Sequence, residues 1–271
     1  MSATSVSARV EATRDRRIPL GAARDTLAIV RRNLIAYRRV PQLLVFSTIQ
    51  PVIFVLMFRY VFGGAITIPG NIPYVDFLMP GIFVQTVVFG AIATSIGLAA
   101  DVKTGLMERF HALPMARSAV LTGRTTADLI RNVFVVILMM VVGFLVGWRI
   151  HTNAFALIGG GLLVLLFGFA MSWIFATVGL AVGDPETAQA AAFPVLAPLV
   201  FASSAFVPIE SMPGWLQVFA EHQPVSATAS AVRALTIGGP TATYVWHSIA
   251  WSVGLIAIFA TISVRLYRRA V

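Results

Sequence analysis

Six long apolar segments, separated by short polar stretches, dominate this sequence. A helix needs about 20 mostly apolar residues, at a rise of about 1.5 Å each, to cross the hydrocarbon core of a bilayer. Segments of roughly that length cover residues 43–62, 77–100, 132–148, 154–182, 188–207 and 244–264. We therefore predict an all-α membrane protein with six transmembrane helices.

The composition excludes an ordinary water-soluble globule. Hydrophobic residues make up 58% of the chain and charged residues only 11%, whereas soluble domains carry about 25% charged residues. The chain has no cysteine, which rules out disulfides, thiolate metal sites and a cysteine nucleophile.

The positions of the basic residues predict the topology. Seventeen of the 20 Lys and Arg residues lie before Pro41, between Lys103 and Arg131, or in 265–269. Basic residues concentrate in cytoplasmic segments of membrane proteins, so we predict a multi-pass plasma-membrane protein with both termini cytoplasmic. The outer connections would be 63–76, 149–153 and 208–243. The dispersal of charge between membrane segments argues against a nucleic-acid-binding face, despite the net charge of +9.

The amino-terminal region predicts a helix lying on the inner leaflet. Residues 1–19 are expected to be disordered and lack the apolar core of a signal peptide. Over 20–40, apolar residues recur at helical spacing while arginines occupy other faces, which is typical of an interfacial amphipathic helix. A basic arm that only sets topology fits the same residues. Pro41 is expected to end the helix, and 265–271 form a cytoplasmic basic tail.

The long connection before the last span is the second unusual segment. Residues 208–243 contain apolar stretches too short to cross, and prolines at 208, 213 and 224. Two short helices are predicted, over 213–221 and 226–235. Such a segment is either interfacial or re-entrant, or an ordinary outer loop with some helix.

The chain lacks the usual signatures of catalysis and of proton-driven transport. All eleven acidic residues can be assigned to termini, loops or span boundaries, so no carboxylate is expected in a span core. The four histidines are scattered, and no HExxH, GxSxG or phosphate-binding GxxxxGK[ST] motif occurs. Asp184-Pro185-Glu186 is typical of a helix start. We predict no catalytic residue, no metal site and no enzyme activity of its own.

A charged insert separates the second and third apolar segments. In 101–114 an apolar stripe at helical spacing runs beside charged residues, Asp101 is placed to cap its start, and Pro114 stops it. A second helix is expected from about Ser118 into the third span. The first helix fits either docking into a groove of another protein or lying on the membrane surface.

Several segments, taken in order, resemble the permease subunit of type-2 ABC exporters, especially the daunorubicin-resistance permease group of actinobacteria. They are 43-LLVFSTIQPVIFVLMFRYVFGGAI-66, 74-YVDFLMPGIFVQT-86, 105-GLMERFHALPMARSAVLTGRTTADL-129 and 205-AFVPIESMPGWLQVFAEHQPVSATASAVRAL-235. The resemblance implies a domain over 41–264 with an amino-terminal elbow helix, a cytoplasmic coupling loop over 101–131 and an outer re-entrant helical hairpin. It also implies that the permease forms a homodimer or a heterodimer with a sister permease. A separate ATPase subunit would bind ATP and Mg. The residues that would contact that ATPase are Lys103, Leu106, Glu108, Arg109, Phe110, His111 and Leu113.

The expected substrate cleft is apolar and aromatic, because amphiphilic substrates need burial more than ion pairing. Candidates come from the first, second and fifth spans, and each Phe could instead serve packing or lipid contact. They are Phe46, Gln50, Phe54, Gln85, Phe89 and Phe201.

The expected function is ATP-driven export of amphiphilic drugs or lipid-like compounds. Two alternatives are a permease for a glycolipid or polysaccharide, and a membrane scaffold subunit that transports nothing. Stimulation of ATP hydrolysis by amphiphiles would distinguish an exporter of amphiphiles from a scaffold subunit.

Overall fold

The computed structural model describes residues 18–39, 42–66, 68, 72–107 and 117–269, and within them the regular structure is entirely helical. The predicted disorder of 1–17, the end of the first helix at Pro41 and most of the predicted coupling helix therefore lie outside the described residues. The prediction of disorder is wrong for Ile18 and Pro19, which form the first residues of α2. The elements are α2 (Ile18–Arg39), α3 (Gln42–Leu56), the π-helix η1 (Met57–Phe62), α4 (Tyr74–Gly90), α5 (Ile92–Lys103), α7 (Arg117–Leu145), α8 (Ala154–Val182), α9 (Pro185–Phe201), the 3₁₀-helix η2 (Ile209–Ser211), α10 (Gly214–His222), α11 (Pro224–Thr236) and α12 (Thr241–Arg269).

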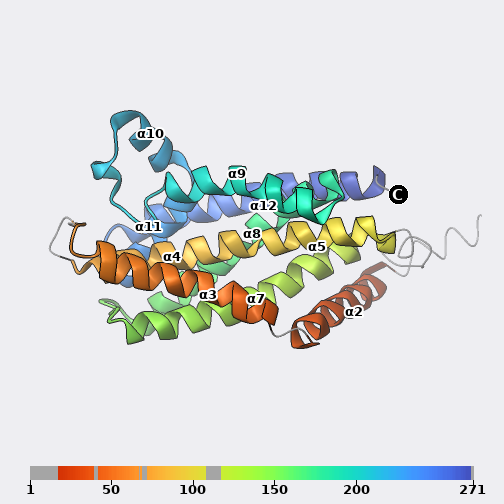
Figure 1. The fold of residues 1–271 in the computed structure, drawn as a ribbon, viewed down its shortest axis with the longest axis horizontal. Coiled ribbons are helices and arrows are strands. Elements are labelled where there is room, and N and C mark those ends of the chain that lie inside the picture. Colours follow the sequence, from red (N-terminus) through yellow and green to blue (C-terminus); the bar gives the residue numbers. More distant parts are fainter. Residues whose placement is uncertain (1–17, 40–41, 67, 69–71, 108–116, 270–271) are drawn as a thin grey trace, which may run out of the picture.

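The bundle is built around α8. This helix is apolar on every face, which is the pattern of a helix surrounded by others or by lipid, and it packs against α4, α5, α7, α9, α11 and α12. Buried aromatic side chains fill the core beside it, among them Phe83, Phe167 and Phe175. The long helices run side by side along the length of the molecule (Figure 1).

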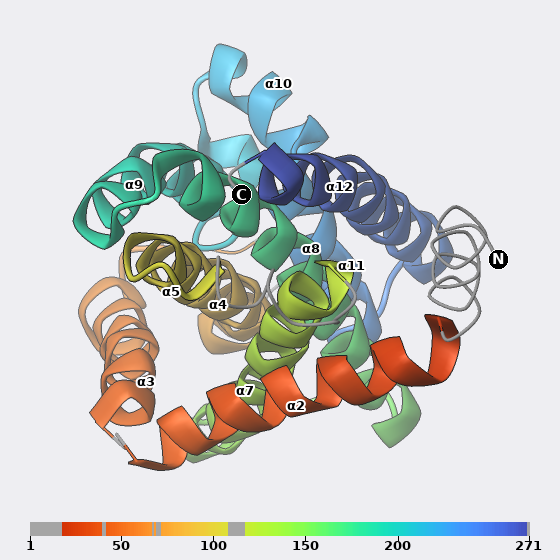
Figure 2. The ribbon, with the colours of Figure 1, turned by 90° about the vertical axis from the view of Figure 1, so that its right-hand side faces the viewer.

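The two ends of the bundle differ in their covering elements. At one end, here called the α2 end, α2 lies across the helix termini (Figure 2) and packs on α7. Tyr267, near the end of α12, is buried there with Leu98, Met107 and Val120. At the opposite end, the α10 end, α10 projects beyond the bundle and α11 packs between α12, α8 and α4 (Figure 1). The first described helix and the last therefore reach the same end.

Among the residues that the structure describes, four helices are long and apolar enough to cross a membrane. They are Tyr74–Lys103 (taking α4 and α5 together), Ala119–Leu145, Ala154–Val182 and Thr241–Tyr267, and they match the second, third, fourth and sixth predicted spans. The first and fifth predicted spans correspond to shorter helices, Ser47–Phe62 and the 17-residue α9. The chain is thus a multi-pass helical membrane protein, and the count of six remains a prediction.

One prediction about helix bounds is wrong and one is confirmed. Asp101 does not begin a helix: it lies in the last turn of α5, which starts at Ile92, and the chain turns at Gly105 with φ of 64°. The helix expected from about Ser118 into the third span is α7, which begins at Arg117. This helix carries Asp128 fully buried, a degree of burial that the sequence did not indicate.

Other local predictions are confirmed. Asp184 caps α9, accepting a hydrogen bond from the Thr187 N–H at 3.0 Å, with Pro185 at the first helical position. The helix predicted over 20–40 is observed as α2, and the helices predicted over 213–221 and 226–235 are α10 and α11.

Candidate functional site

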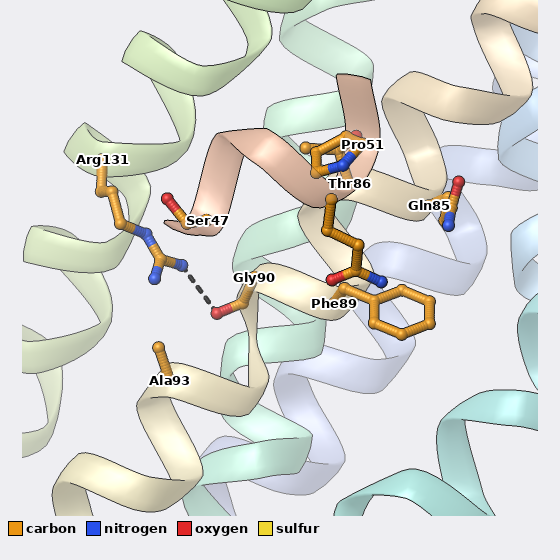
Figure 3. A pocket seen from close by; sticks show the side chains of 9 residues that line it. Ser47, Pro51, Gln85, Thr86, Phe89, Gly90, Ala93 and Arg131 are labelled. Atoms are coloured by element: carbon orange, nitrogen blue, oxygen red, sulfur yellow. Dashed lines mark hydrogen bonds between the residues drawn. The ribbon is translucent and has the colours of Figure 1, made fainter. Parts of the chain in front are cut away.

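A small pocket opens between α3, α4, the start of α5 and α7. Its volume is about 100 Å³. The lining combines polar side chains with an aromatic ring and small residues, from three spans that are distant in sequence (Figure 3). The lining residues are Ser47, Gln50, Pro51, Gln85, Thr86, Phe89, Gly90, Ala93 and Arg131.

The pocket forms at a break between α4 and α5. In a continuous helix the Thr94 N–H would bond to the Gly90 carbonyl, but it bonds to Ala91 O at 3.0 Å instead. The Gly90 carbonyl accepts a hydrogen bond from Arg131 Nη2 at 2.7 Å (Figure 3). A Cβ at position 90 would stand 3.0 Å from that nitrogen, so glycine gives Arg131 room to approach. The break frees the Gly90 carbonyl from the helix, and Arg131 supplies the hydrogen bond that this carbonyl would otherwise lack.

Gln85 is the second buried polar group of the pocket. Its side chain is only 2% exposed, and its Oε1 has no hydrogen-bond partner among the described residues. A buried amide that lacks a partner costs free energy, because it has lost its hydrogen bond to water. Such a group is a candidate to bind a polar ligand.

An aromatic cluster lies near the pocket, toward the α10 end of α3. Phe58 stacks on Phe206 with ring centroids 4.5 Å apart, and Phe54 lies 6.0 Å from Phe58 and 6.4 Å from Phe201. Phe201 is 47% exposed in this chain. The cluster offers an apolar, partly open surface formed by α3, η1 and the end of α9.

The predicted cleft residues fall into two groups. Gln50, Gln85 and Phe89 meet in the pocket, whereas Phe54 and Phe201 belong to the aromatic cluster. The backbone of Phe46 lies in α3, but its side chain is outside what the structure describes.

Sequence reasoning missed Arg131, Ser47 and Thr86. Arg131 had been assigned to the cytoplasmic loop because the third span was expected to start after it. Its signal was available: Arg131 lies fourteen residues past the start of a helix whose apolar pattern already runs through Leu121 and Ala127.

A network of charged and polar side chains joins α2, α5 and α7 between the pocket and the α2 end. The buried Asp128 accepts hydrogen bonds from Tyr37 Oη (2.8 Å) and Thr94 Oγ1 (2.5 Å), and Arg124 Nε lies 3.9 Å from it. Asp101 pairs with Arg32 at 3.0 Å and with Arg124 at 3.8 Å.

This network fixes the position of α2. Burial, followed by the charge of Asp128, raises the pKa of Tyr37 to about 12, so the phenol remains a neutral donor near neutral pH. Since α2 contributes both Tyr37 and Arg32, it is attached to α7 and to the end of α5 through side chains as well as through apolar packing.

The predicted coupling residues are only partly described. Lys103 and Leu106 lie at the α2 end, where Lys103 Nζ donates to Asp184 Oδ1 at 2.7 Å and so links the end of α5 to the α8–α9 junction. The Lys103 side chain is exposed and that of Asp184 is half-buried. The hydrogen bond from Lys103 holds the pKa of Asp184 below its usual range. The other five, Glu108, Arg109, Phe110, His111 and Leu113, lie outside the described residues.

The chain between α9 and η2 is irregular yet buried, and side chains satisfy its backbone. The Gln223 amide donates to Ala202 O, Tyr74 Oη donates to Phe206 O at 2.9 Å, and the Ser204 N–H donates to Ser226 Oγ at 3.0 Å. Non-helical backbone at membrane depth is tolerated only when protein groups satisfy it. This stretch, residues 202–207, is called the α9 junction below.

Arg233 of α11 is the central donor of the α9 junction. It is 9% exposed, and its Nη2 donates to Ser204 O (2.5 Å) and Ala205 O (3.1 Å) while its Nε donates to Phe77 O (2.9 Å). Its guanidinium lies 3.6 Å from the centroid of the Phe77 ring.

Within the described ranges, no three His, Asp or Glu side chains gather closely enough to hold a metal ion. The conspicuous groups are instead a polar pocket within the membrane-crossing helices and two sets of side chains that tie helices together at the ends of the bundle.

Comparison with known proteins identifies the family of the chain. The sequence pattern of the ABC-2 type transporter family matches residues 24–237. The chain is 36% identical to the daunorubicin resistance ABC transporter permease protein DrrB1 of Streptomyces coeruleorubidus, covering 90% of this chain and 86% of that protein. It is 26% identical to a probable doxorubicin resistance ABC transporter permease of Mycobacterium tuberculosis (91% and 89% covered) and 29% identical to a putative transport permease of Porphyra purpurea (76% and 72% covered). Since the family pattern covers most of the chain, including the pocket, the network below it and the α9 junction, the protein belongs to the ABC-2 type transporter family as a membrane permease subunit.

Proposed function

We propose that this permease exports amphiphilic compounds, drugs or lipid-like molecules, across the plasma membrane in a complex driven by a separate ATPase. The observation that carries the proposal is the 36% identity, over 90% of the chain, to a permease named for daunorubicin resistance. The pocket and the neighbouring aromatic cluster support it, since they combine polar and apolar surface as an amphiphile requires.

The proposed topology has six spans and places the α2 end in the cytoplasm. The 15 residues of α3 and the 6 of η1 extend about 30 Å together, enough for a first span. The 17 residues of α9 extend about 25 Å, and the buried α9 junction completes the fifth. In this proposal α2 is the elbow helix, and α10 and α11 form the outer re-entrant hairpin. The permease domain covers 41–264 and follows the elbow over 20–40. The cytoplasmic tails are residues 1–19 and the basic residues 265–271.

The energy source is a partner. The sequence has no phosphate-binding loop, so ATP and Mg would be bound by an ATPase subunit, and the permease would work as a homodimer or with a sister permease. The proposed contact with that ATPase is the coupling helix over 101–114, within the coupling loop predicted over 101–131. The Lys103–Asp184 pair adds the α8–α9 junction to the same surface.

The mechanism would use α5 as a rigid lever. This helix runs about 15 Å from the pocket residue Ala93 to Lys103 at the cytoplasmic end. Closure of the ATPase subunits on ATP would shift its lower end, and the pairing of Asp101 with α2 and α7 would pass the shift to both helices. The break at Gly90 is where we expect the pocket to change shape.

The test is reconstitution of the permease with its ATPase partner in lipid vesicles. We expect amphiphilic drugs or lipid-like compounds to stimulate ATP hydrolysis and to be moved in a nucleotide-dependent way. Stimulation by a glycolipid or polysaccharide alone would favour that alternative substrate. A flat response to every compound, with a stable complex, would favour a scaffold subunit.

A charge reversal in the proposed contact segment tests the role of the ATPase. Glu108→Arg should leave membrane insertion intact but abolish transport and weaken retention of the ATPase subunit, because the contact would then carry the wrong charge. Co-purification and drug-stimulated ATP hydrolysis measure both effects.

The matched control for that variant is Glu210→Arg, the same charge reversal on the exposed η2 at the α10 end. It should leave transport and ATPase retention unchanged. Wild-type export by the Glu108→Arg complex would remove the coupling role of this segment.

A further inference from the structure

We propose that the pocket at the α4–α5 break is a binding site for an anionic headgroup, with Arg131 as its cation. The ligand would be a phosphate- or carboxylate-bearing amphiphile, either a membrane lipid or an exported compound. This inference rests on the proposed function and narrows its substrate class.

The charge of Arg131 is not matched by a carboxylate. Among the described residues, no Asp or Glu lies within ion-pairing distance of its guanidinium, although it is only 6% exposed. The nearest acidic residue along the helix is Asp128, which is already bonded to Tyr37 and Thr94 and lies close to Arg124. An arginine within an apolar helix is costly unless it meets a partner, so an unmatched one indicates a functional site.

The local hydrogen bonds use only part of the guanidinium. Nη2 donates to Gly90 O at 2.7 Å and to Asn132 Oδ1 at 3.2 Å, whereas no hydrogen bond from Nε or Nη1 occurs within the part of the chain that the structure describes. The Tyr37 ring lies 5.9 Å from the guanidinium carbon. Arginine offers five N–H donors in a planar fork suited to carboxylate and phosphate, so donors are left for a ligand.

The other polar groups of the pocket fit the same ligand. Gln50 and Gln85 have amide N–H groups that can donate to an anionic oxygen, and the Gln85 Oε1 without a partner can accept from a hydroxyl of the headgroup. No acidic side chain lines the pocket. The pocket therefore offers one positive charge and several hydrogen-bond donors, and no negatively charged side chain.

The size of the pocket limits it to a headgroup. Its volume of about 100 Å³ is well below that of pockets for whole drug-sized ligands, which measure about 300–1,000 Å³. Phe89, Pro51 and Ala93 form the apolar part of the lining. An amphiphile would thus place its charged group in the pocket and its apolar body outside.

The experiment uses the permease–ATPase complex in phosphatidylcholine nanodiscs and amphiphiles that share one fluorescent acyl chain. Their headgroups are phosphate, uncharged glycerol or trimethylammonium. We expect the phosphate compound to bind about tenfold more tightly than the glycerol compound, and the trimethylammonium compound to bind most weakly. The same order is expected in the concentrations that half-stimulate ATP hydrolysis.

Three variants separate binding from structure. Arg131→Gln keeps a donor for Gly90 O but loses the charge, so it should abolish the tenfold preference while binding the glycerol compound normally. Arg131→Lys should retain most of the preference. Arg149→Gln is the control, because Arg149 follows the other end of α7, is exposed and also donates to backbone carbonyls. It should bind all three compounds as the wild type does.

Competition distinguishes the source of the headgroup. Phosphatidylglycerol in the nanodisc should displace the phosphate probe if a membrane lipid is the natural ligand, and should not if the site is reserved for an exported compound. Excess inorganic phosphate should displace the probe in both cases, at concentrations far above those of the probe.

Equal binding of the three headgroups to the wild type, or a preference that survives in Arg131→Gln, would overturn the inference while leaving export of amphiphiles intact. Absence of binding and of stimulation by every compound would instead reject the proposed function as well.

Discussion

Replacing Arg233 by leucine is expected to cost at least about 3 kcal/mol of folding free energy and to release the α10–α11 hairpin from the bundle. The change leaves the carbonyls of Ser204 and Ala205 buried without this donor, and each such group costs about 1–3 kcal/mol. The Phe77 carbonyl, within α4, loses its additional bond from the guanidinium. The cation–π contact with Phe77 is lost as well. Thermal unfolding in detergent measures the loss, and protease sensitivity of 208–240 reports the release.

Two further variants test the reason for that loss. Arg233→Lys keeps the charge but cannot reach several carbonyls with one planar fork, so an intermediate loss is expected. Arg149→Leu removes an exposed arginine that also bonds to carbonyls, and a change within about 0.5 kcal/mol is expected, as for ordinary surface substitutions. A stable Arg233→Leu protein with a protected hairpin would show that the α9 junction holds without its cation.

The second large effect is expected for glycine-to-alanine changes in α8. They should lower or raise the free energy of unfolding according to the position of the glycine along the helix. At Gly179 an added Cβ would stand 2.3 Å from Ser95 O, a backbone atom of α5, so α5 and α8 must move apart. Overpacking of this kind costs about 1–3 kcal/mol of folding free energy. Because the obstructing atoms belong to the backbone and cannot rotate away, we expect a loss in the upper part of that range. The midpoint of thermal unfolding is the measurement.

Gly159 provides the matched comparison on the same helix. An added Cβ there meets no atom within 4 Å, and alanine is favoured over glycine in a helix by up to about 1 kcal/mol. Gly159→Ala should therefore be neutral or slightly stabilising. If the two variants were equally stable, the close approach of α5 and α8 would not contribute to folding.

The fold was largely predictable because its signals are local. The length of an apolar run predicts a crossing helix, and Asp184-Pro185 predicts the start of α9, since capping needs only neighbouring residues. The helices α10 and α11 could be placed because Pro213 and Pro224 mark where each begins. These features require no knowledge of tertiary contacts.

The pocket was predictable only in part, because it depends on contacts between distant segments. Gln50 and Gln85 were identified since amides within apolar runs need partners, and they do meet. Arg131 was missed because its environment is created by the break at Gly90, where α4 ends. Gly90 is one of three glycines in 74–103, and the sequence alone does not distinguish it from Gly81 and Gly97, which lie within helices. The burial of Asp128 was not predicted for a related reason: its partner Tyr37 of α2 is 91 residues away.

The α9 junction makes three helices one mechanical unit. Its backbone groups are held by Tyr74 at the start of α4 and by Gln223, Ser226 and Arg233 of the hairpin, so displacing any of these elements alone would strand several polar groups in an apolar setting. During a transport cycle the start of α4, the end of α9 and α11 should therefore travel together as a rigid body. Bending at that end is expected instead at the joint to α12, where Gly238 and Gly239 adopt φ of 110° and 125°.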